Sequence, residues 1–271
     1  MLSNESLASE VLGHGAYVCL SRIAGAGPTP DVAPLTALTE RLELRNEFDP
    51  GDPPSRESFA LLRRQSATPF DIADEGILAA DWVLHVASKR GEVVDEFCHG
   101  VTKALAPIAR ARVLRGVVRP KNYTGAAMNN WAYGHAVVQQ PGGTMPNAFL
   151  CPMSKTPEWW RKDWMERHTY FLPRYDEQGR MVSEGHALAT AAGIPCLLRR
   201  TYKSMTEPAA EGDYDFVSYF ECADEAIPTF HAVCDALRDV KRNPEWRFVR
   251  EGPTWQGRRA ASWEELLAAR R

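Results

Sequence analysis

The chain has 271 residues, of which 44% are hydrophobic and 25% charged, and its net charge at pH 7 is −3. This length suits one large domain or two small ones, and the charge lacks the basic excess of nucleic-acid-binding proteins. No apolar run is long enough to span a bilayer, and the first residues lack the basic start and apolar core of a signal peptide. The six cysteines, at positions 19, 98, 151, 196, 222 and 234, form no CxxC pair. We therefore expect a soluble cytoplasmic protein with free thiols and with no nucleic-acid or membrane partner.

The first half of the chain alternates between strand and helix patterns. Alternating apolar residues predict strands at 15–23, 58–65, 81–88 and 111–118. Apolar residues at helical spacing predict helices at 35–44 and 92–105, and the segment 68–80 is expected to be irregular. The predicted order is strand, helix, strand, strand, helix, strand.

The second half repeats this order in recognisable letters. The matches are GAYVCLSR (15–22) with NAFLCPMSK (147–155), FALLRR (59–64) with PCLLRR (195–200), DWVLHV (81–86) with DFVSYF (215–220), EVVDEFCHGVTKAL (92–105) with EAIPTFHAVCDAL (225–237), and ARVLRGVVRP (111–120) with EWRFVREGP (245–253). The first match aligns Cys19 with Cys151. Five matches in one order indicate an internal duplication. Each βαββαβ unit is a ferredoxin-like repeat, and two such sheets can bury their free faces together. We predict an α+β fold in which two fused ferredoxin-like repeats, residues 1–125 and 126–271, form an α+β barrel of the dimeric type.

The second half carries additions that the first lacks. Residues 129–145 form an extra segment, in which WAYGHAVVQQ (131–140) is a candidate strand. The region 157–193 is longer than its partner and begins with Thr156 as a predicted N-cap before Pro157. PRYDEQGR (173–180) interrupts it, so we expect a second helix from about Met181 to Ala192, ended by Gly193. Residues 262–271 carry a capping-box pattern and predict a C-terminal helix.

One stretch of the second half, residues 183–202, concentrates the candidate site residues. His186 lies on the predicted helix, a run of small residues follows it, and Arg199 and Arg200 lie on the next predicted strand. By the repeat, Arg199 corresponds to Arg63, whereas His186 corresponds to Pro50 in a loop. A site that uses both His186 and Arg199 is therefore expected only in the second repeat. A single histidine in such a place is more often a hydrogen-bonded helix residue than a ligand.

Four segments of the second half resemble a known family. FLCPMSKTPEWW (149–160), EGHALATAAGIPCLLRRTY (184–202), DYDFVSYFE (213–221) and REGPTWQG (250–257) are similar, in this order, to segments of chlorite dismutases and their relatives. NYTG (122–125) is similar to a segment of the longer members. This family consists of heme proteins built from two ferredoxin-like repeats, so the resemblance implies the same fold, with heme b as the cofactor.

The resemblance also implies roles for particular residues. His186 matches the axial ligand of the heme iron, and Arg199, thirteen positions later, matches the distal residue. The other residues carried over to the cofactor pocket are Lys155, Trp159, Trp160, Tyr123 and Tyr202. A neutral imidazole leaves the sixth iron position open, and Arg199 remains cationic and can hold an anion there. Lys155 is expected to neutralise a propionate at the mouth, and the tryptophans to wall the macrocycle. Without the resemblance, Trp159 and Trp160 would be core residues and Lys155 the surface end of a strand.

The chain departs from the family pattern at several positions. Cys151 stands where the coproheme decarboxylases of the family have a reactive tyrosine, which argues against that reaction. The glutamate that bonds the proximal histidine in chlorite-splitting members follows a Val-Lys pair, but here Arg242 follows Val240 and Lys241. Glu245 or Asp239 could replace it, or the bond could be missing. The segment 161–180 is longer than in the enzymes of this family and holds a weaker candidate ligand, His168.

These patterns support three hypotheses about function. The first is a heme b oxidoreductase resembling chlorite dismutase, acting on an oxo-anion, a peroxide or a small organic substrate. The second is a non-catalytic heme-binding or heme-sensing protein, motivated by the missing glutamate. The third is a barrel without heme. The resemblance further implies a homo-oligomer, with a pentamer as the expected form.

Overall fold

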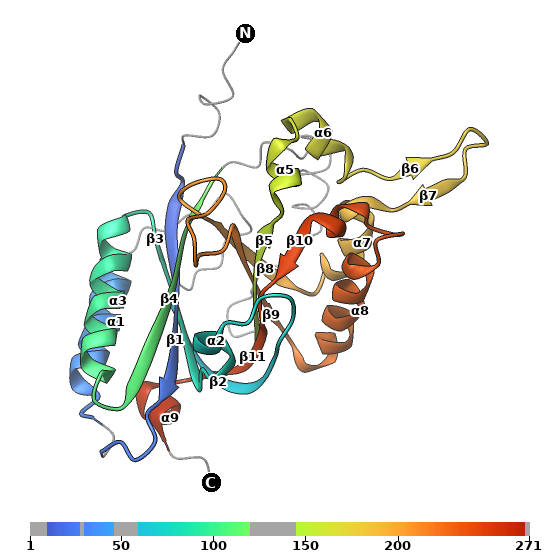
Figure 1. Ribbon diagram of the computed structural model, residues 1–271. Coiled ribbons are helices and arrows are strands. Elements are labelled where there is room, and N and C mark those ends of the chain that lie inside the picture. The colour runs from blue at the N-terminus through green and yellow to red at the C-terminus, as the bar shows by residue number, and fades with distance from the viewer. Residues whose placement is uncertain (1–9, 28–29, 46–58, 120–144, 269–271) are drawn as a thin grey trace.

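Eight antiparallel strands close into a barrel in the computed structural model, which describes residues 10–27, 30–45, 59–119 and 145–268 (Figure 1). The barrel is made of two four-stranded halves joined edge to edge. The strand order is β4-β1-β3-β2 in the first half and β11-β5-β9-β8 in the second. The edge strand β2 pairs with β11, and β4 pairs with β8. The predicted α+β barrel of two ferredoxin-like repeats is therefore confirmed.

The first repeat has the predicted element order. Its elements are β1 (Gly13–Arg22), α1 (Ala33–Arg45), β2 (Phe59–Thr68), α2 (Glu75–Leu78), β3 (Trp82–Ser88), α3 (Gly91–Leu105) and β4 (Ala109–Val118). The short helix α2 lies in the segment that was expected to be irregular, and Asp74 caps it by accepting a hydrogen bond from the Ile77 N–H. Helices α1 and α3 pack on the outer side of the barrel, where Leu35, Leu42 and Val101 are buried against Val18 and Leu84.

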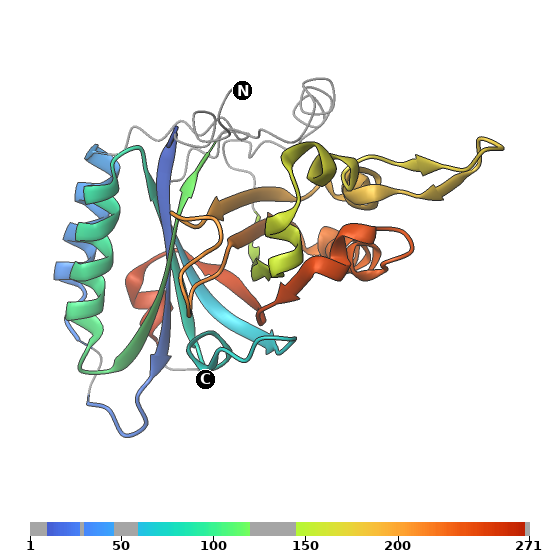
Figure 2. The ribbon, with the colours of Figure 1, turned by 45° about the horizontal axis from the view of Figure 1, so that its top comes forward.

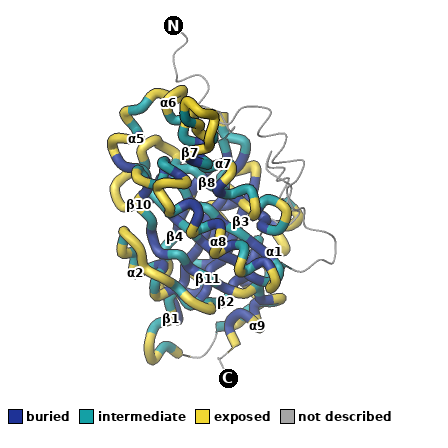
Figure 3. Tube along the Cα trace, turned by 90° about the vertical axis from the view of Figure 1, so that its right-hand side faces the viewer, coloured by how far each residue is buried: buried dark blue, intermediate teal, exposed yellow. Residues whose placement is uncertain are grey.

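The second repeat has the same strands with more elements between them. They are β5 (Asn147–Lys155), α5 (Pro157–Arg161), α6 (Trp164–Thr169), β6 (Arg174–Tyr175), β7 (Met181–Ser183), α7 (Gly185–Thr190), the 3-10 turn η1 (Ala191–Gly193), β8 (Leu198–Lys203), β9 (Phe216–Cys222), η2 (Asp224–Ala226), α8 (Ile227–Arg238), η3 (Pro244–Phe248), β10 (Val249–Glu251), β11 (Thr254–Ala260) and α9 (Trp263–Leu267). Figure 3 shows the barrel strands as the most continuously buried part of the molecule and much of α5 and α6 as exposed.

Two of the predicted elements are wrong. Residues 245–253 do not supply the fourth strand of the repeat, because 244–248 form η3 and β10 pairs only with the end of β5; the fourth strand is β11. The predicted helix 181–192 begins later, since residues 181–183 form β7, which pairs with β6 in a hairpin. Gly179, at φ +75°, makes the hairpin turn and donates its N–H to the Asp176 carbonyl at 3.0 Å. This hairpin extends away from the barrel in both views (Figures 1 and 2).

The C-terminal helix α9 has the predicted cap, because the Ser262 hydroxyl accepts a hydrogen bond from the Glu265 N–H at 3.2 Å. Arg63, the counterpart of Arg199 in the repeat, donates to backbone carbonyls at the end of this helix, including that of Leu266 at 2.7 Å. The predicted boundary between the repeats, at 125/126, and the candidate strand at 131–140 lie outside the described residues. No helix in the described part of the chain is long and apolar enough to cross a membrane.

Candidate functional site

His186 is the second residue of α7, a helix whose first turn is hydrogen-bonded to the segment that follows α6. Its backbone N–H donates to the Tyr170 carbonyl at 3.1 Å, and the Ala187 N–H donates to the Phe171 carbonyl at the same distance. The His186 ring also lies 5.0 Å from the Phe171 ring, centroid to centroid. One helical turn further on, Ala189 is buried against the outer side of the second repeat's sheet. His186 is thus on the helix side that faces the barrel.

The imidazole of His186 bonds to a buried carboxylate. Glu245 Oε2 lies 2.8 Å from His186 Nδ1, and the other oxygen of Glu245 pairs with the Lys155 ammonium. The Glu245 and Lys155 side chains are each only 5% exposed. Burial alone would raise the pKa of Glu245, but the interactions of its carboxylate with Lys155 and His186 outweigh burial and lower that pKa to about 2. Glu245 is therefore an anion at neutral pH, and of the alternatives left open by the sequence, a Glu245 bond, an Asp239 bond or none, the structure has the first.

Lys155 does not lie where the sequence placed it. A propionate-binding residue at a pocket mouth would be exposed, whereas the Lys155 ammonium is enclosed between Glu245 and the Trp159 ring, 4.3 Å from the ring centroid. Trp159 is 4% exposed and joins this buried group. The reading of Lys155 as a surface strand end is therefore wrong too. The position of Lys155 suits it to fix the Glu245 carboxylate beside His186.

Trp160 points to a different surface from its neighbour Trp159. Its indole N–H lies 3.3 Å from Asp215 Oδ2, which also accepts from the Lys155 backbone N–H at 2.6 Å. Its ring stacks on Phe216 of β9, with centroids 6.3 Å apart and planes at 11°. Asp215, which sequence reasoning did not single out, thus ties Trp160 to the end of β5.

Arg199 and Arg200 lie on opposite faces of β8. Arg200 is 5% exposed and points into the barrel, whereas Arg199 is exposed on the outer face, where it pairs in register with Phe220 of β9. Phe220 packs against Phe230 of α8, which places Arg199 on the helix-covered side of the sheet. Among the residues that the structure describes, none hydrogen-bonds or ion-pairs with the Arg199 guanidinium.

Small side chains line the outer face of the sheet next to Arg199. Cys151 of β5, Ser218 of β9 and Thr201 of β8 lie side by side in register, and all three are only partly buried. The Thr201 and Ser218 hydroxyls lie 3.4 Å apart. Burial raises the pKa of the Cys151 thiol, so it remains protonated at neutral pH. This row of small side chains keeps the outer surface of the sheet close to its backbone here.

Two residues predicted for the pocket are not brought into this group. Tyr202 lies inside the barrel, 2% exposed, with its hydroxyl 2.8 Å from His85 Nε2. Three positions separate it from Arg199, and strand alternation therefore puts the two side chains on opposite faces. Tyr123 lies outside the described residues. The weaker candidate ligand, His168, is near the end of α6.

The imidazole of His186 suits a single axial ligand. Because Nδ1 is engaged by Glu245, Nε2 keeps the lone pair that a metal ion needs, and the carboxylate makes this nitrogen a stronger donor. In the described ranges, no group of three or more His, Cys, Asp or Glu residues could hold a metal ion. A single imidazole with Nε2 available fits a metal ion whose other ligands belong to a cofactor, such as heme.

Comparison with known proteins gives structural but not sequence-level matches. No protein-family model matches the chain, and no curated protein matches it by sequence. A mutant chlorite dismutase from Candidatus Nitrospira defluvii in complex with cyanide superposes with a TM-score of 0.68 at 20% identity, over 98% of each chain. Chlorite dismutase from the same organism in complex with imidazole gives a TM-score of 0.67 at 19% identity, over 97% of each chain. The chain therefore has the fold of chlorite dismutases, which confirms, at the level of the fold, the resemblance that its sequence motifs indicated.

Proposed function

We propose that this protein is a heme b-dependent oxidoreductase resembling chlorite dismutase, in which His186 would bind the heme iron and Arg199 would interact with the substrate. The observation that carries this proposal is the buried chain Lys155–Glu245–His186. A buried carboxylate held by a buried ammonium costs free energy in desolvation, so it is unusual as a mere packing device. Its role here is to orient the imidazole and to increase its donor strength.

Different residues of the chain would hold the iron and contact the macrocycle. Glu245 keeps the Nδ1 proton on His186 and leaves Nε2 for the metal, while Lys155 keeps Glu245 ionised. When bound, heme iron supplies the redox chemistry and an open coordination position. The small side chains of Cys151, Ser218 and Thr201 would let a flat macrocycle approach the sheet, and Trp160 lies beside this row through its stacking on Phe216.

The substrate class follows from Arg199. A guanidinium that is always charged, and that no described residue neutralises, can attract a small anion and hold the charge that develops on it. This supports an oxo-anion such as chlorite, with chloride and dioxygen as products; peroxides and small organic molecules are the other substrates to test. The two similar structures are complexes with cyanide and with imidazole, both small ligands.

The proposal is tested by oxygen release. Hemin-loaded protein is mixed with chlorite and oxygen is followed with an electrode. The proposal predicts oxygen release well above that of free hemin, a loss of about tenfold or more in Arg199→Ala, and background rates in His186→Ala. Oxygen release no faster than from free hemin would remove chlorite as the substrate, and peroxide and organic reductants would then be tried on the same preparations.

The non-catalytic alternative has lost the observation that motivated it. It was based on a missing proximal glutamate, and Glu245 supplies that hydrogen bond. A homo-oligomer remains a prediction, which sedimentation of the heme-loaded protein tests directly.

A further inference from the structure

The start of α7 is held by the segment that also carries Glu245. The helix has no side-chain cap, and its first N–H groups are satisfied by carbonyls from elsewhere in the chain. The Glu184 and Gly185 N–H groups both donate to the Arg242 carbonyl, at 2.9 and 3.0 Å. The residue that departs from the family pattern, Arg242, is thus in direct contact with the residue before the helix that bears His186.

The side chain of Arg242 also forms hydrogen bonds with the Glu184 carboxylate. Its Nε donates to Glu184 Oε1 at 3.0 Å, and a terminal nitrogen donates to Oε2 at 2.9 Å. This two-point pairing of a planar guanidinium with a carboxylate fixes orientation as well as distance. The two side chains are 47% and 25% exposed, so the pair adds little to global stability and is better suited to alignment.

The segment from Arg242 to Glu245 is held in place by burial and by hydrogen bonds. Asn243 is fully buried, its side chain donates to the Leu237 carbonyl at 3.1 Å, and its N–H donates to the Asp239 carbonyl at 2.7 Å. The Trp246 N–H then donates to the Asn243 carbonyl at 3.1 Å. Arg242 is three residues from Glu245 and Glu184 is two residues from His186, so a displacement of either residue would reach the pair through the backbone.

We propose that Arg242 is a positioning residue for the His186–Glu245 pair. Two connections link the segment of Arg242 and Glu245 to the segment of Glu184 and His186. One is the Arg242–Glu184 contact and the other is the Glu245–His186 hydrogen bond. The Arg242–Glu184 contact sets the geometry of the hydrogen bond. As far as it concerns the iron, this proposal rests on the proposed function; as a statement about the hydrogen bond at His186 Nδ1, it holds for the heme-free protein as well.

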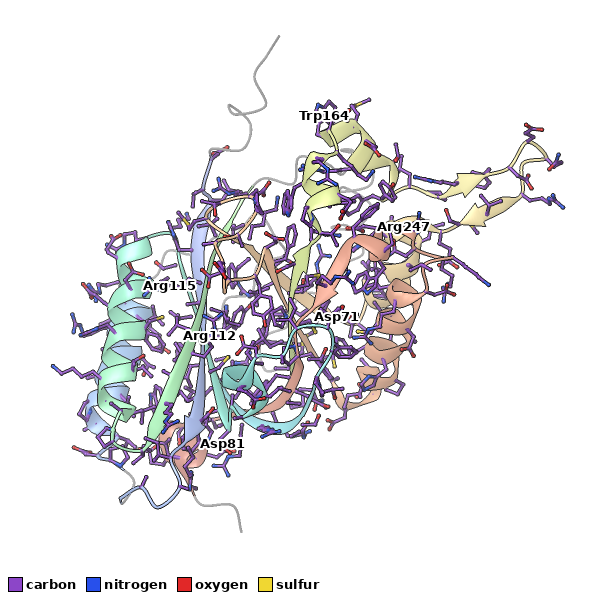
Figure 4. All side chains as sticks on the ribbon, in the orientation of Figure 1. Asp71, Asp81, Arg112, Arg115, Trp164 and Arg247 are labelled. Carbon is purple, nitrogen blue, oxygen red and sulfur yellow. The ribbon has the colours of Figure 1, made fainter. Side chains whose placement is uncertain are left out.

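The first test uses the heme-free protein. The Nδ1 proton of His186 is observed by NMR on protein labelled with nitrogen-15 in its histidines, with Glu245→Gln to assign the hydrogen-bonded signal. We expect the signal to move or vanish in Arg242→Ala and in Glu184→Gln, and to return in Arg242→Lys at least in part. Arg247→Ala is the matched control, because Arg247 is an exposed arginine on η3 whose side chain, among the described residues, donates to the Pro244 carbonyl of its own segment and to no other group (Figure 4). The Nδ1 signal of Arg247→Ala should equal that of the wild type. Tm should change by no more than about 4 °C in each variant of Arg242 and Glu184.

The second test uses the heme-loaded protein. A loosened carboxylate donates less electron density through the imidazole, so the midpoint potential of the iron should rise in Arg242→Ala and Glu184→Gln and stay unchanged in Arg247→Ala. An unchanged Nδ1 signal in both Arg242→Ala and Glu184→Gln would overturn the proposal. If Arg242→Ala does not fold, Glu184→Gln and Arg242→Lys decide. A protein that takes up no heme would defeat the proposed function, while the NMR test would still decide the role of Arg242.

Discussion

Glu245 accepts a hydrogen bond from His186 across 59 positions of sequence, with Nδ1 and Oε2 2.8 Å apart. The two residues come from different elements, α7 and η3, and neither is fixed by its own helix alone. Lys155 at the end of β5 completes the group. Three segments of the second repeat thus converge on one imidazole.

Replacing Glu245 by glutamine should destabilise the fold. The amide can still face His186, but it leaves the Lys155 ammonium buried without a counter-charge. Breaking a buried pair in this way costs about 3–5 kcal/mol, measurable as the free energy of unfolding in urea. The double variant Glu245→Gln, Lys155→Met serves as the control and should recover part of the loss, because it removes the unpaired charge. Equal losses in the single and double variants would show that the pair is not the cause.

The same carboxylate predicts a pH dependence of stability. The pKa of Glu245 is lowered in the folded state, from 4.5 to about 2, so the folded state binds the proton less readily than the unfolded state. Its contribution is present in full above pH 4.5 and is lost as the pH falls toward 2, for a total of about 3 kcal/mol. Urea unfolding of the wild type and Glu245→Gln between pH 6 and 2 measures it. The difference between the two proteins should shrink with acidification, and a constant difference would contradict this.

Substitutions of Arg199 and Arg200 should have different effects, the first on anion binding and the second on the free energy of unfolding. Arg200→Ala removes a buried side chain from the barrel and should lower the free energy of unfolding by about 2 kcal/mol or more. Arg199→Ala changes an exposed side chain and should stay within about 0.5 kcal/mol, while it weakens the binding of small anions to the heme-loaded protein. Thermal unfolding and anion titration of both variants make the comparison. The reverse pattern would mean that the two side chains have been assigned to the wrong faces.

Gly185 should not tolerate alanine. Its φ is +67°, and an added Cβ would lie 2.4 Å from the Leu172 carbonyl oxygen. We expect Gly185→Ala to cost about 3 kcal/mol or more and to weaken heme uptake, because residue 186 is displaced with it. Gly179 is the matched control, since it has a similar φ of +75° with open space around it, and Gly179→Ala should cost only about 1 kcal/mol. Equal costs in thermal unfolding would point to backbone strain alone.

Much of the barrel could be predicted from the sequence because its strands repeat. The repeat placed β1 to β4 and three of the four strands of the second half. It failed for β11, because an edge strand β10 of three residues precedes it and drew the alignment to 245–253. It also aligned Cys19 with Cys151, although Cys19 faces the barrel interior and Cys151 the outer side. A shift of one residue reverses every side chain of a strand, and identical letters cannot reveal it.

The parts of the site that depend on a single segment could be predicted from the sequence, whereas the contacts between distant segments could not. The sequence placed His186 on a helix and Arg199 on a strand, and the structure agrees on both placements. The sequence left the partner of His186 open between Glu245, Asp239 and none, because only tertiary packing brings η3 to α7. Tyr202 was grouped with Arg199 by family likeness alone, although strand alternation already separates them. The predicted helix 181–192 includes β7, because the turn residues of the hairpin, Asp176 and Gly179, also suit a helix interruption.

The most direct test of the account is the absorption spectrum of the purified protein before and after addition of hemin. We predict uptake of one heme per chain, with a Soret band that is lost or displaced in His186→Ala and retained in His168→Ala. Failure of the wild type to take up heme, or an unchanged spectrum in His186→Ala, would contradict the assignment of His186 as the iron ligand.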